Sequence, residues 1–150
     1  MDIRLVRPED IPAVIDHVTT TLAEFGLVFG EGANTDDQLR GLPASYDTGA
    51  FWVAYDRDQL VGTAGVFPVA DKTYELRKMY LSAATRGNGL AARMLETAIA
   101  WCREHGATMI VLDTTEQMTR AIAFYEKHGF VRDDAQRRGS RCSRGYALAL

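Results

Sequence analysis

The segment Arg86-Gly87-Asn88-Gly89-Leu90-Ala91 has the residue types of an anion-binding loop. Its two glycines allow sharp turns and let backbone N–H groups approach a ligand closely. The apolar spacing after Gly89 predicts a helix, whose first N–H groups are unpaired and whose dipole is positive at the same place. Arg86 adds a fixed positive charge. The combination favours a pyrophosphate site, and the alternative is a tight strand–helix turn with an incidental arginine.

Two other phosphate-binding motifs fit this loop less well. A P-loop requires Gly-Lys-Ser/Thr, whereas this sequence has Leu90-Ala91 at that place. The pattern Gly87-x-Gly89-x-x-Ala92 matches the loose Rossmann dinucleotide fingerprint, and Asp113 follows at nearly the right distance. However, antiparallel strands are expected before the loop and only one crossover after it. A Rossmann-type dinucleotide binder is therefore the weaker alternative.

The elements that must position this loop are read from hydrophobic periodicity and turn residues. The expected strands are residues 2–7, 51–55, 60–69, 73–82, 109–112 and 147–150. The expected helices are residues 8–25, 34–42, 89–105 and 119–128. Short connections make the strands from 51 to 82 antiparallel, whereas the strand–loop–helix–strand unit that follows implies a parallel pair with a right-handed crossover. The expected fold class is α/β with a mixed sheet (α+β).

Length and composition limit the classes of protein that the chain could belong to. At 150 residues it is expected to be one domain, residues 1–150. A formal net charge of −3 argues against general nucleic-acid binding. No long apolar run and no apolar signal core are present, so a soluble, cytoplasmic protein without a membrane partner is expected. Cys102 and Cys142 cannot form a disulfide framework, and no residues have metal-ligand spacing, so no metal is expected.

Basic residues gather near the C-terminal end of the chain. Residues 132–150 carry a net charge of +3, whereas residues 1–131 carry −6. The plain explanation is solvated surface, and the sharper one is an acidic face for a cationic substrate with a separate basic patch. Cys142 lies within the basic segment, which favours a lowered thiol pKa.

Three motifs resemble those of the GNAT superfamily of acyl-CoA-dependent N-acyltransferases. The loop Arg86–Ala91 looks like its Arg/Gln-x-x-Gly-x-Gly/Ala signature. Residues 75–81, Glu-Leu-Arg-Lys-Met-Tyr-Leu, resemble the strand that precedes the signature, and residues 121–130, Ala-Ile-Ala-Phe-Tyr-Glu-Lys-His-Gly-Phe, resemble its late helix. The motifs occur in the family's order and spacing. The resemblance implies a GNAT-like fold, in which antiparallel strands precede a β-loop-α-β unit that binds acyl-CoA.

The resemblance also implies acetyl-CoA as the acyl donor and assigns its binding residues. The strand residues that would hold the pantetheine arm, chiefly through backbone groups, are Met79, Tyr80 and Leu81. The loop residues that would hold the pyrophosphate are Arg86, Gly87, Asn88, Gly89, Leu90 and Ala91. An amide-bearing arm can add to an exposed strand edge as a peptide does. One departure is Met118, where many relatives carry asparagine.

The chemistry implied is N-acetylation of a primary amine by direct transfer. Glu75 matches the position of a general base in some members, acting directly or through water, and the alternative is a strand carboxylate paired with Arg77 or Lys78. Tyr125 matches the tyrosine that protonates the CoA sulfur, and the alternative is a helix residue that packs beside Phe124 with a satisfied hydroxyl. A different class of function is a non-catalytic acyl-CoA-binding or sensor module with the same fold.

The sequence leaves the acceptor open among polyamines, amino acids, drug-like amines and protein amines. The segment from Phe25 to Asp37 is the candidate wall of the acceptor site. Acidic residues there would attract a cationic amine, namely Glu24, Glu31, Asp36 and Asp37. Apolar residues there would hold its carbon skeleton, namely Phe25, Leu27, Val28 and Phe29. Alternatively, Arg138, Arg141 and Arg144 would bind the carboxylate of an amino-acid-like substrate. A homodimer is also left open.

Overall fold

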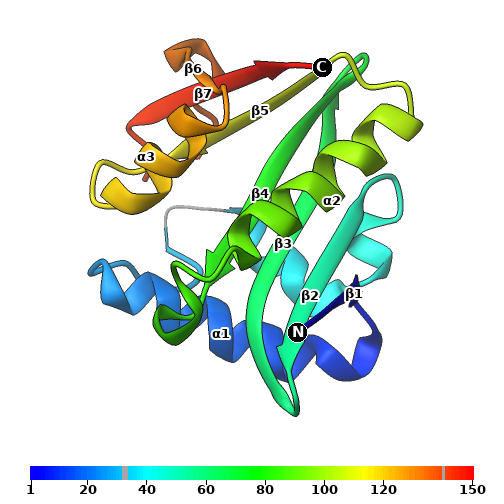
Figure 1. Cartoon of the computed structure of the whole chain (residues 1–150), viewed down its shortest axis with the longest axis vertical. Coiled ribbons are helices and arrows are strands. Elements are labelled where there is room, and N and C mark those ends of the chain that lie inside the picture. Colours follow the sequence, from blue (N-terminus) through cyan, green and yellow to red (C-terminus); the bar gives the residue numbers. More distant parts are fainter. Residues whose placement is uncertain (32–33, 140) are drawn as a thin grey trace.

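The computed structural model describes residues 1–31, 34–139 and 141–150. Its strands are β1 (Asp2–Leu5), β2 (Ala50–Asp56), β3 (Gln59–Ala70), β4 (Thr73–Leu81), β5 (Met109–Thr114), β6 (Val131–Arg132) and β7 (Arg144–Ala149). Its α-helices are α1 (Ile11–Glu24), α2 (Leu90–Glu104) and α3 (Thr119–Lys127). Its 3-10 helices are η1 (Pro8–Asp10), η2 (Asn34–Gly41), η3 (Ala44–Tyr46), η4 (Ala83–Thr85) and η5 (Asp134–Gln136). The strands form a seven-stranded sheet in the order β1-β2-β3-β4-β5-β7-β6 (Figure 1). The expected mixed α/β fold is confirmed.

The N-terminal half of the sheet is an antiparallel meander, as expected. β1 to β4 pair in sequence order, and each pair is antiparallel. The tight turns place Arg57 at φ 57° and Lys72 at φ 53°, a left-handed conformation that a two-residue connection between twisted strands favours. Short turns of this kind keep β2, β3 and β4 in register, so that β4 stands at the centre of the sheet.

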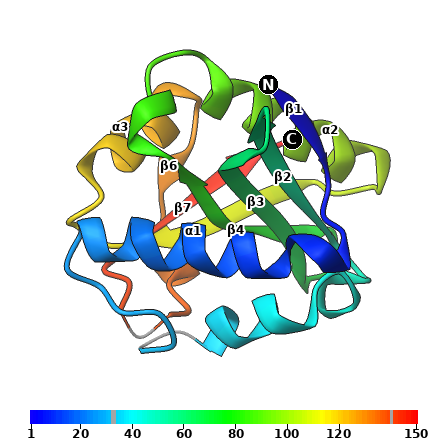
Figure 2. The same ribbon diagram turned by 90° about the horizontal axis from the view of Figure 1, so that it is seen from below.

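Helices cover both faces of the sheet (Figure 2). Val14, Val18 and Leu22 recur at helical spacing on α1, and all three are fully buried in a cluster that includes Phe51 and Val53 of β2. The other face is covered by α2, whose buried residues are Leu90, Met94, Leu95, Ala98 and Cys102. Burial of one large apolar side chain contributes about 1.5–3 kcal/mol, so these two stripes fix the helices against the sheet. None of the described helices is long and apolar enough to cross a membrane.

Two expected elements differ from the structure. Residues 34–42 were expected to form a helix, and the structure has the 3-10 helix η2 there, because a short polar segment gains too little burial to stabilise regular α-helix. The last strand begins at Arg144 rather than Ala147, because it pairs with β5 along six residues, and the two-residue β6 beyond it was not expected. The second difference arises from strand pairing that local periodicity does not encode.

The parallel pairing of β4 with β5 is short. Only Thr73–Glu75 of β4 face Met109–Val111 of β5, and beyond these residues the two strands diverge (Figure 1). On its far side β5 pairs antiparallel with β7 through Thr114. The mutually facing edges of Leu76–Leu81 and Leu112–Thr114 therefore have no strand partner within the described part of the chain. Such edges need another source of hydrogen bonds.

Candidate active site

A cavity of about 980 Å³ opens where β4 and β5 diverge. It is lined by β4, by the loop before α2, by the end of β5 and by α3. The sequence-predicted residues that line it are Glu75, Met79, Tyr80, Leu81, Arg86, Gly87, Gly89, Ala91 and Tyr125. Asn88 and Leu90 are not among its lining residues. The fold thus gathers most of the proposed site from four separate elements around one space.

A β-bulge shapes β4 where it borders the cavity. Between Arg77 and Tyr80 the strand has one residue more than its partner β3, and Lys78 adopts φ 54°. Thr63 Oγ1 on β3 donates a hydrogen bond of 2.7 Å to the Lys78 carbonyl. The bulge turns the strand edge away from β5 and alters which side chains face the cavity.

His17 of α1 fixes the next part of β4. Its Nε2 lies 2.8 Å from the carbonyl oxygen of Tyr80, and because a carbonyl only accepts, Nε2 must carry the proton. Burial lowers the pKa of His17, so the ring is neutral at pH 7. The sequence showed only a lone histidine on the helix, and nothing in the spacing indicated this contact.

The predicted anion-binding loop has the expected local geometry. Gly87 and Gly89 adopt φ 87° and 85°, and a Cβ at either position would meet nothing within 4 Å, so the loop backbone is openly accessible. Asn88 Oδ1 accepts a hydrogen bond of 3.1 Å from the Leu90 N–H. This N–H of the first helical residue therefore already has a partner within the loop. Leu90 itself is buried in the core. Within this segment, the residues that line the cavity are Arg86, Gly87, Gly89 and Ala91, the last of which belongs to α2.

Arg86 is held in place at the mouth of this loop. Its Nε donates to the Leu81 carbonyl at 3.1 Å, and its Nη2 lies 2.9 Å from Glu24 Oε2 on α1. Glu24, which was expected to attract a cationic acceptor, is therefore engaged with Arg86 instead. The guanidinium remains partly exposed beside the open glycine backbone.

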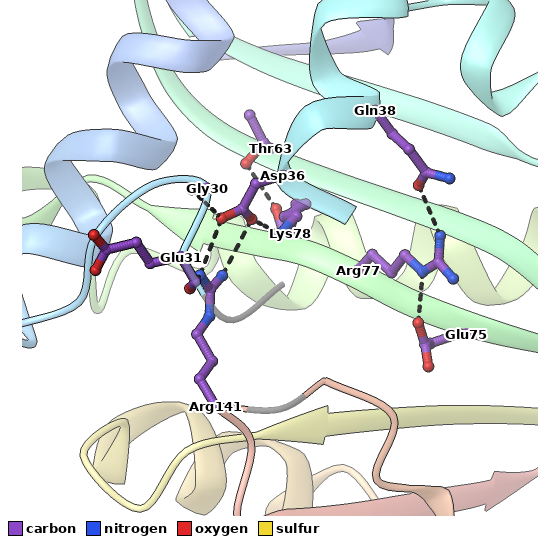
Figure 3. A network of polar contacts seen from close by, with 9 residues as sticks. All are labelled: Gly30, Glu31, Asp36, Gln38, Thr63, Glu75, Arg77, Lys78 and Arg141. Carbon is purple, nitrogen blue, oxygen red and sulfur yellow. Dashed lines mark hydrogen bonds and ion pairs between the residues drawn. The ribbon is translucent and has the colours of Figure 1, made fainter. Parts of the chain in front are cut away.

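Glu75 lies at the point where β4 leaves β5. Its side chain is only 4% exposed, and its Oε1 accepts a hydrogen bond of 2.5 Å from Arg77 Nε (Figure 3). Arg77 is itself fixed by Gln38 Oε1 at 3.0 Å and by the ring of Phe67. Glu75 Oε2 is buried without a hydrogen-bond partner among the described residues, with Arg138 Nη1 3.5 Å away. The pairing with Arg77 thus exists, but it leaves one carboxylate oxygen available.

Tyr125 of α3 borders the same cavity from the other side. Its ring is 6% exposed and packs edge-on against Phe124 and Phe130, with ring centroids 5.7 and 5.5 Å away. No hydrogen-bond partner for its hydroxyl is present in the described part of the chain. Burial raises the pKa of this phenol above its usual value of 10, and the neighbouring Tyr80 adds to the effect. The phenol is therefore fully protonated at neutral pH.

Asp36 of η2 anchors a buried ionic cluster above the bulge (Figure 3). Its carboxylate is fully buried, pairs with Lys78, and accepts hydrogen bonds from both terminal nitrogens of Arg141 at 3.0 and 3.1 Å. The Gly30 N–H donates a further bond of 2.7 Å. Burial alone would raise the pKa of Asp36, but the hydrogen bonds from Arg141 and the charge of Lys78 outweigh it and lower the pKa below 3.8. Asp36 was expected to attract a cationic amine, but its carboxylate is already neutralised by Lys78 and Arg141.

The other candidates near the acceptor side divide into two groups. Those that line the cavity are Phe25, Arg138 and Arg141. Those that do not are Glu31, Asp37, Leu27, Val28, Phe29 and Arg144. Arg144 instead binds Glu116 at 2.8 Å and the Tyr146 hydroxyl at 3.2 Å. Met118 lies at the cavity wall and is buried in the core.

The expectation for Cys142 was wrong. The structure raises the pKa of its thiol to about 12, because the sulfur is buried and lies close to the Asp113 carboxylate. The basic segment was expected to lower it, but the charge of Arg141 has a smaller effect than burial and Asp113, and its guanidinium binds Asp36. Cys142 is therefore a poor nucleophile at neutral pH.

Comparison with known proteins identifies the family. Residues 19–130 match the model of the acetyltransferase (GNAT) family. The chain is 34% identical over 128 residues to the uncharacterized N-acetyltransferase YjgM of Escherichia coli K12, covering 81% of this chain and 77% of that protein. The chain therefore belongs to the acetyltransferase (GNAT) family, and the similarity supports N-acetyltransferase activity.

Solved structures share the fold. An acetyltransferase of the GNAT family from Staphylococcus aureus Mu50 superposes with a TM-score of 0.88 at 19% identity, covering 99% of this chain and 98% of that one. The PaiA N-acetyltransferase of Thermoplasma acidophilum, solved in complex with coenzyme A, superposes with a TM-score of 0.75 at 18% identity and covers 99% and 98%. At these identities the similarity establishes the fold.

Replacement of Asp36 tests the ionic cluster. Asp36→Asn leaves Lys78 and Arg141 without their buried counter-charge, so the free energy of unfolding at pH 7 should fall by roughly 3–5 kcal/mol. The lowered pKa means that this stabilisation is complete above the ordinary carboxyl pKa of 3.8 and is lost as the pH falls through the folded-state value. Urea unfolding measured from pH 7 to pH 3 should therefore show the two proteins converging in acid. Asp37→Asn, on the exposed neighbour, is the control, and equal stability of all three proteins at pH 7 would contradict the assignment.

Proposed function

We propose that the chain is an N-acetyltransferase that transfers an acetyl group from acetyl-CoA directly to a primary amine. The observation that carries this proposal is the cavity between β4 and β5, which has an unpartnered carboxylate oxygen of Glu75 on one side and the protonated phenol of Tyr125 on the other. Membership of the family and the coenzyme A complex of the PaiA enzyme support the choice of donor.

The residues present fit a CoA-type donor. Within the described residues, the edge of β4 from Met79 to Leu81 has no strand partner on the cavity side. The Tyr80 and Leu81 carbonyls already accept hydrogen bonds from His17 and Arg86, and the remaining backbone groups of this edge suit the amides of an extended arm. Thr115 lines the cavity, and its buried Oγ1, which has no hydrogen-bond partner among the described residues, can supply one more polar contact. The accessible backbone at Gly87 and Gly89, with the helix dipole of α2 behind it, suits the pyrophosphate. When bound, acetyl-CoA supplies the reactive thioester.

Glu75 is proposed to collect the proton of the acceptor. An alkyl amine titrates near 10.4, so it arrives protonated and must lose that proton before it can attack. Glu75 Oε2 is the oxygen proposed to accept it, directly or through one water, because it has no hydrogen-bond partner among the described residues while Oε1 is held by Arg77. The hydrogen bond from Arg77 fixes the orientation of the carboxylate, which reduces the reorganisation that proton transfer requires.

Tyr125 is proposed to supply a proton to the departing sulfur. Its raised pKa keeps the hydroxyl protonated at neutral pH. The ring is held between Phe124 and Phe130, so the hydroxyl has a fixed direction at the cavity wall. A phenol without a competing acceptor is available for this donation.

Two alternatives are separated by a pair of simple measurements. A catalytic protein releases thiol from acetyl-CoA in the presence of an amine panel, whereas a non-catalytic sensor binds CoA without turnover. A thermal-shift comparison of CoA with NAD tests the Rossmann alternative, since a ligand at about 100 times its Kd stabilises the folded state by about 2.7 kcal/mol. Stabilisation by CoA, thiol release with at least one amine and no effect of NAD are expected. Binding of CoA with no turnover on any amine would favour the sensor.

Tyr125→Phe tests the acid. Because the ring and its packing remain, CoA binding should change little, while kcat falls about 10²–10⁴-fold. Tyr74→Phe is the matched control, since Tyr74 packs against Trp101 and is not a lining residue of the cavity. An unchanged kcat under conditions in which chemistry limits the rate would remove Tyr125 from this role.

Glu75→Gln tests the base. The amide cannot take up the ammonium proton, so the acidic limb of the pH profile of kcat/KM should disappear and the rate at neutral pH should fall about 10²–10⁴-fold. Glu96→Gln, on the exposed surface of α2, is the control. If the acidic limb persists in Glu75→Gln, the proton is collected by another group.

A further inference from the structure

The acceptor end of the cavity, defined here as the part bordered by Glu75, Arg77, Lys78, Arg138 and Arg141, has an excess of positive charge. Its four cations face the carboxylates of Glu75, Asp36 and Asp113. Lys78 and Arg141 share the single carboxylate of Asp36, and Arg77 and Arg138 share that of Glu75. The Asp113 carboxylate accepts hydrogen bonds from two backbone N–H groups. A wall of this charge repels a polycation and attracts an anion.

Arg138 is the cation best placed to bind such an anion. Its side chain is 37% exposed, which makes it the most accessible of the four. Its Nη1 donates to the carbonyl and to the side-chain oxygen of Gln136 at 3.0 and 3.2 Å. Among the described residues no acceptor is present for its Nε and Nη2. The guanidinium therefore retains donors for a planar oxyanion.

The position of Arg138 is fixed by β5 rather than left to a long loop. The Asp113 carboxylate accepts hydrogen bonds of 2.6 and 2.7 Å from the backbone N–H groups of Arg138 and Gly139. These bonds attach the Arg138 backbone to the strand that forms one edge of the cavity. A cation held in this way loses little freedom on binding a ligand.

The spacing between Glu75 and Arg138 selects the acceptor. Glu75 Oε2 and Arg138 Nη1 are 3.5 Å apart, and both residues line the cavity. From this spacing, which rests on the proposed function, we propose that the acceptor is a free α-amino acid, with its amine on Glu75 and its carboxylate on Arg138. In an α-amino acid the nitrogen and the carboxylate carbon are about 2.5 Å apart by standard bond lengths. The two charges of the zwitterion thus match the two charges of the pair.

Other amines match this pair poorly. A polyamine presents only positive charge to a wall that contains Arg138 and its three neighbouring cations. The side-chain amine of a protein lysine has no carboxylate within four methylene groups, so it would leave Arg138 unpaired. An amino-acid amide keeps the amine but removes the charge that the guanidinium binds. Each of these acceptors forfeits the charge-assisted hydrogen bonds of the carboxylate.

The test compares acceptors that differ only in the carboxylate. The rate of thiol release from acetyl-CoA is measured with the twenty L-amino acids, their amides, their decarboxylated amines and spermidine. The best amino acid should exceed its own amide and decarboxylated amine by about 10- to 100-fold in kcat/KM, the size of effect expected for hydrogen bonds to a charged group. Amides or decarboxylated amines that perform as well as the acids overturn the inference and leave the proposed function intact. If no amine of any class is acetylated, the proposed function itself is overturned.

Variants assign the discrimination to Arg138. In Arg138→Gln the preference for the acid over its amide should fall at least about 10-fold, chiefly through a higher KM for the acid. Arg138→Lys should restore part of the preference because it keeps the charge but not the planar fork. Arg137→Gln, whose exposed side chain is outside the cavity lining, should behave as wild type. A uniform loss on acids and amides in Arg138→Gln would show a structural role instead and overturn the assignment.

Discussion

The divergence of β4 from β5 is the constraint on which the rest of the structure depends. Parallel pairing lasts for three residues of each strand, after which β5 continues beside β7 and β4 bends away at the bulge around Lys78. Two unpaired strand edges inside a folded domain are costly unless something else satisfies them. A ligand-sized cavity lies there, and two buried oxygens of its lining residues, Glu75 Oε2 and Thr115 Oγ1, have no hydrogen-bond partner in the part of the chain that the structure describes.

The bulge is held by contacts from the neighbouring strand β3, from α1 and from η2. On one side Thr63 binds the Lys78 carbonyl and His17 binds that of Tyr80, so neighbouring strand and helix fix the backbone. Above it, Asp36 binds the Lys78 ammonium and attaches η2 and the Arg141 segment to the same point. Because a buried carboxylate must be neutralised, this arrangement specifies position more than it adds stability. The acceptor end of the cavity is thereby assembled from three segments that are distant in the sequence.

Features that depend on neighbouring residues could be predicted from the sequence, whereas features that depend on contacts between distant segments could not. Strands β1 to β5, the end of β7, helices α1 to α3 and the loop at Gly87 and Gly89 were predictable, because alternation, helical spacing and left-handed glycines act within a few residues. The left-handed backbone conformation of Lys78 was not predictable, because nothing in the neighbouring sequence requires a positive φ within a strand. The bonds of Asp36 to Lys78 and Arg141 span 42 and 105 residues, so an acidic residue in a polar segment was interpreted as a free charge when it is fully neutralised.

The charges of the chain are unevenly distributed between the cavity and the rest of the surface. The sequence totals −3, yet the charged residues that line the cavity, within the described part, are mainly cations, from Arg86 and Lys127 at one end to Arg138 at the other. The acidic excess therefore lies outside the cavity, where it is solvated and has little influence on binding. A domain can keep such an interior charge because backbone geometry and fixed guanidinium groups, rather than overall charge, set the local potential. The donor end depends on local backbone, and the acceptor end on long-range side-chain contacts. The residues at the acceptor end can therefore vary with substrate while the strands and loop that position the donor stay the same.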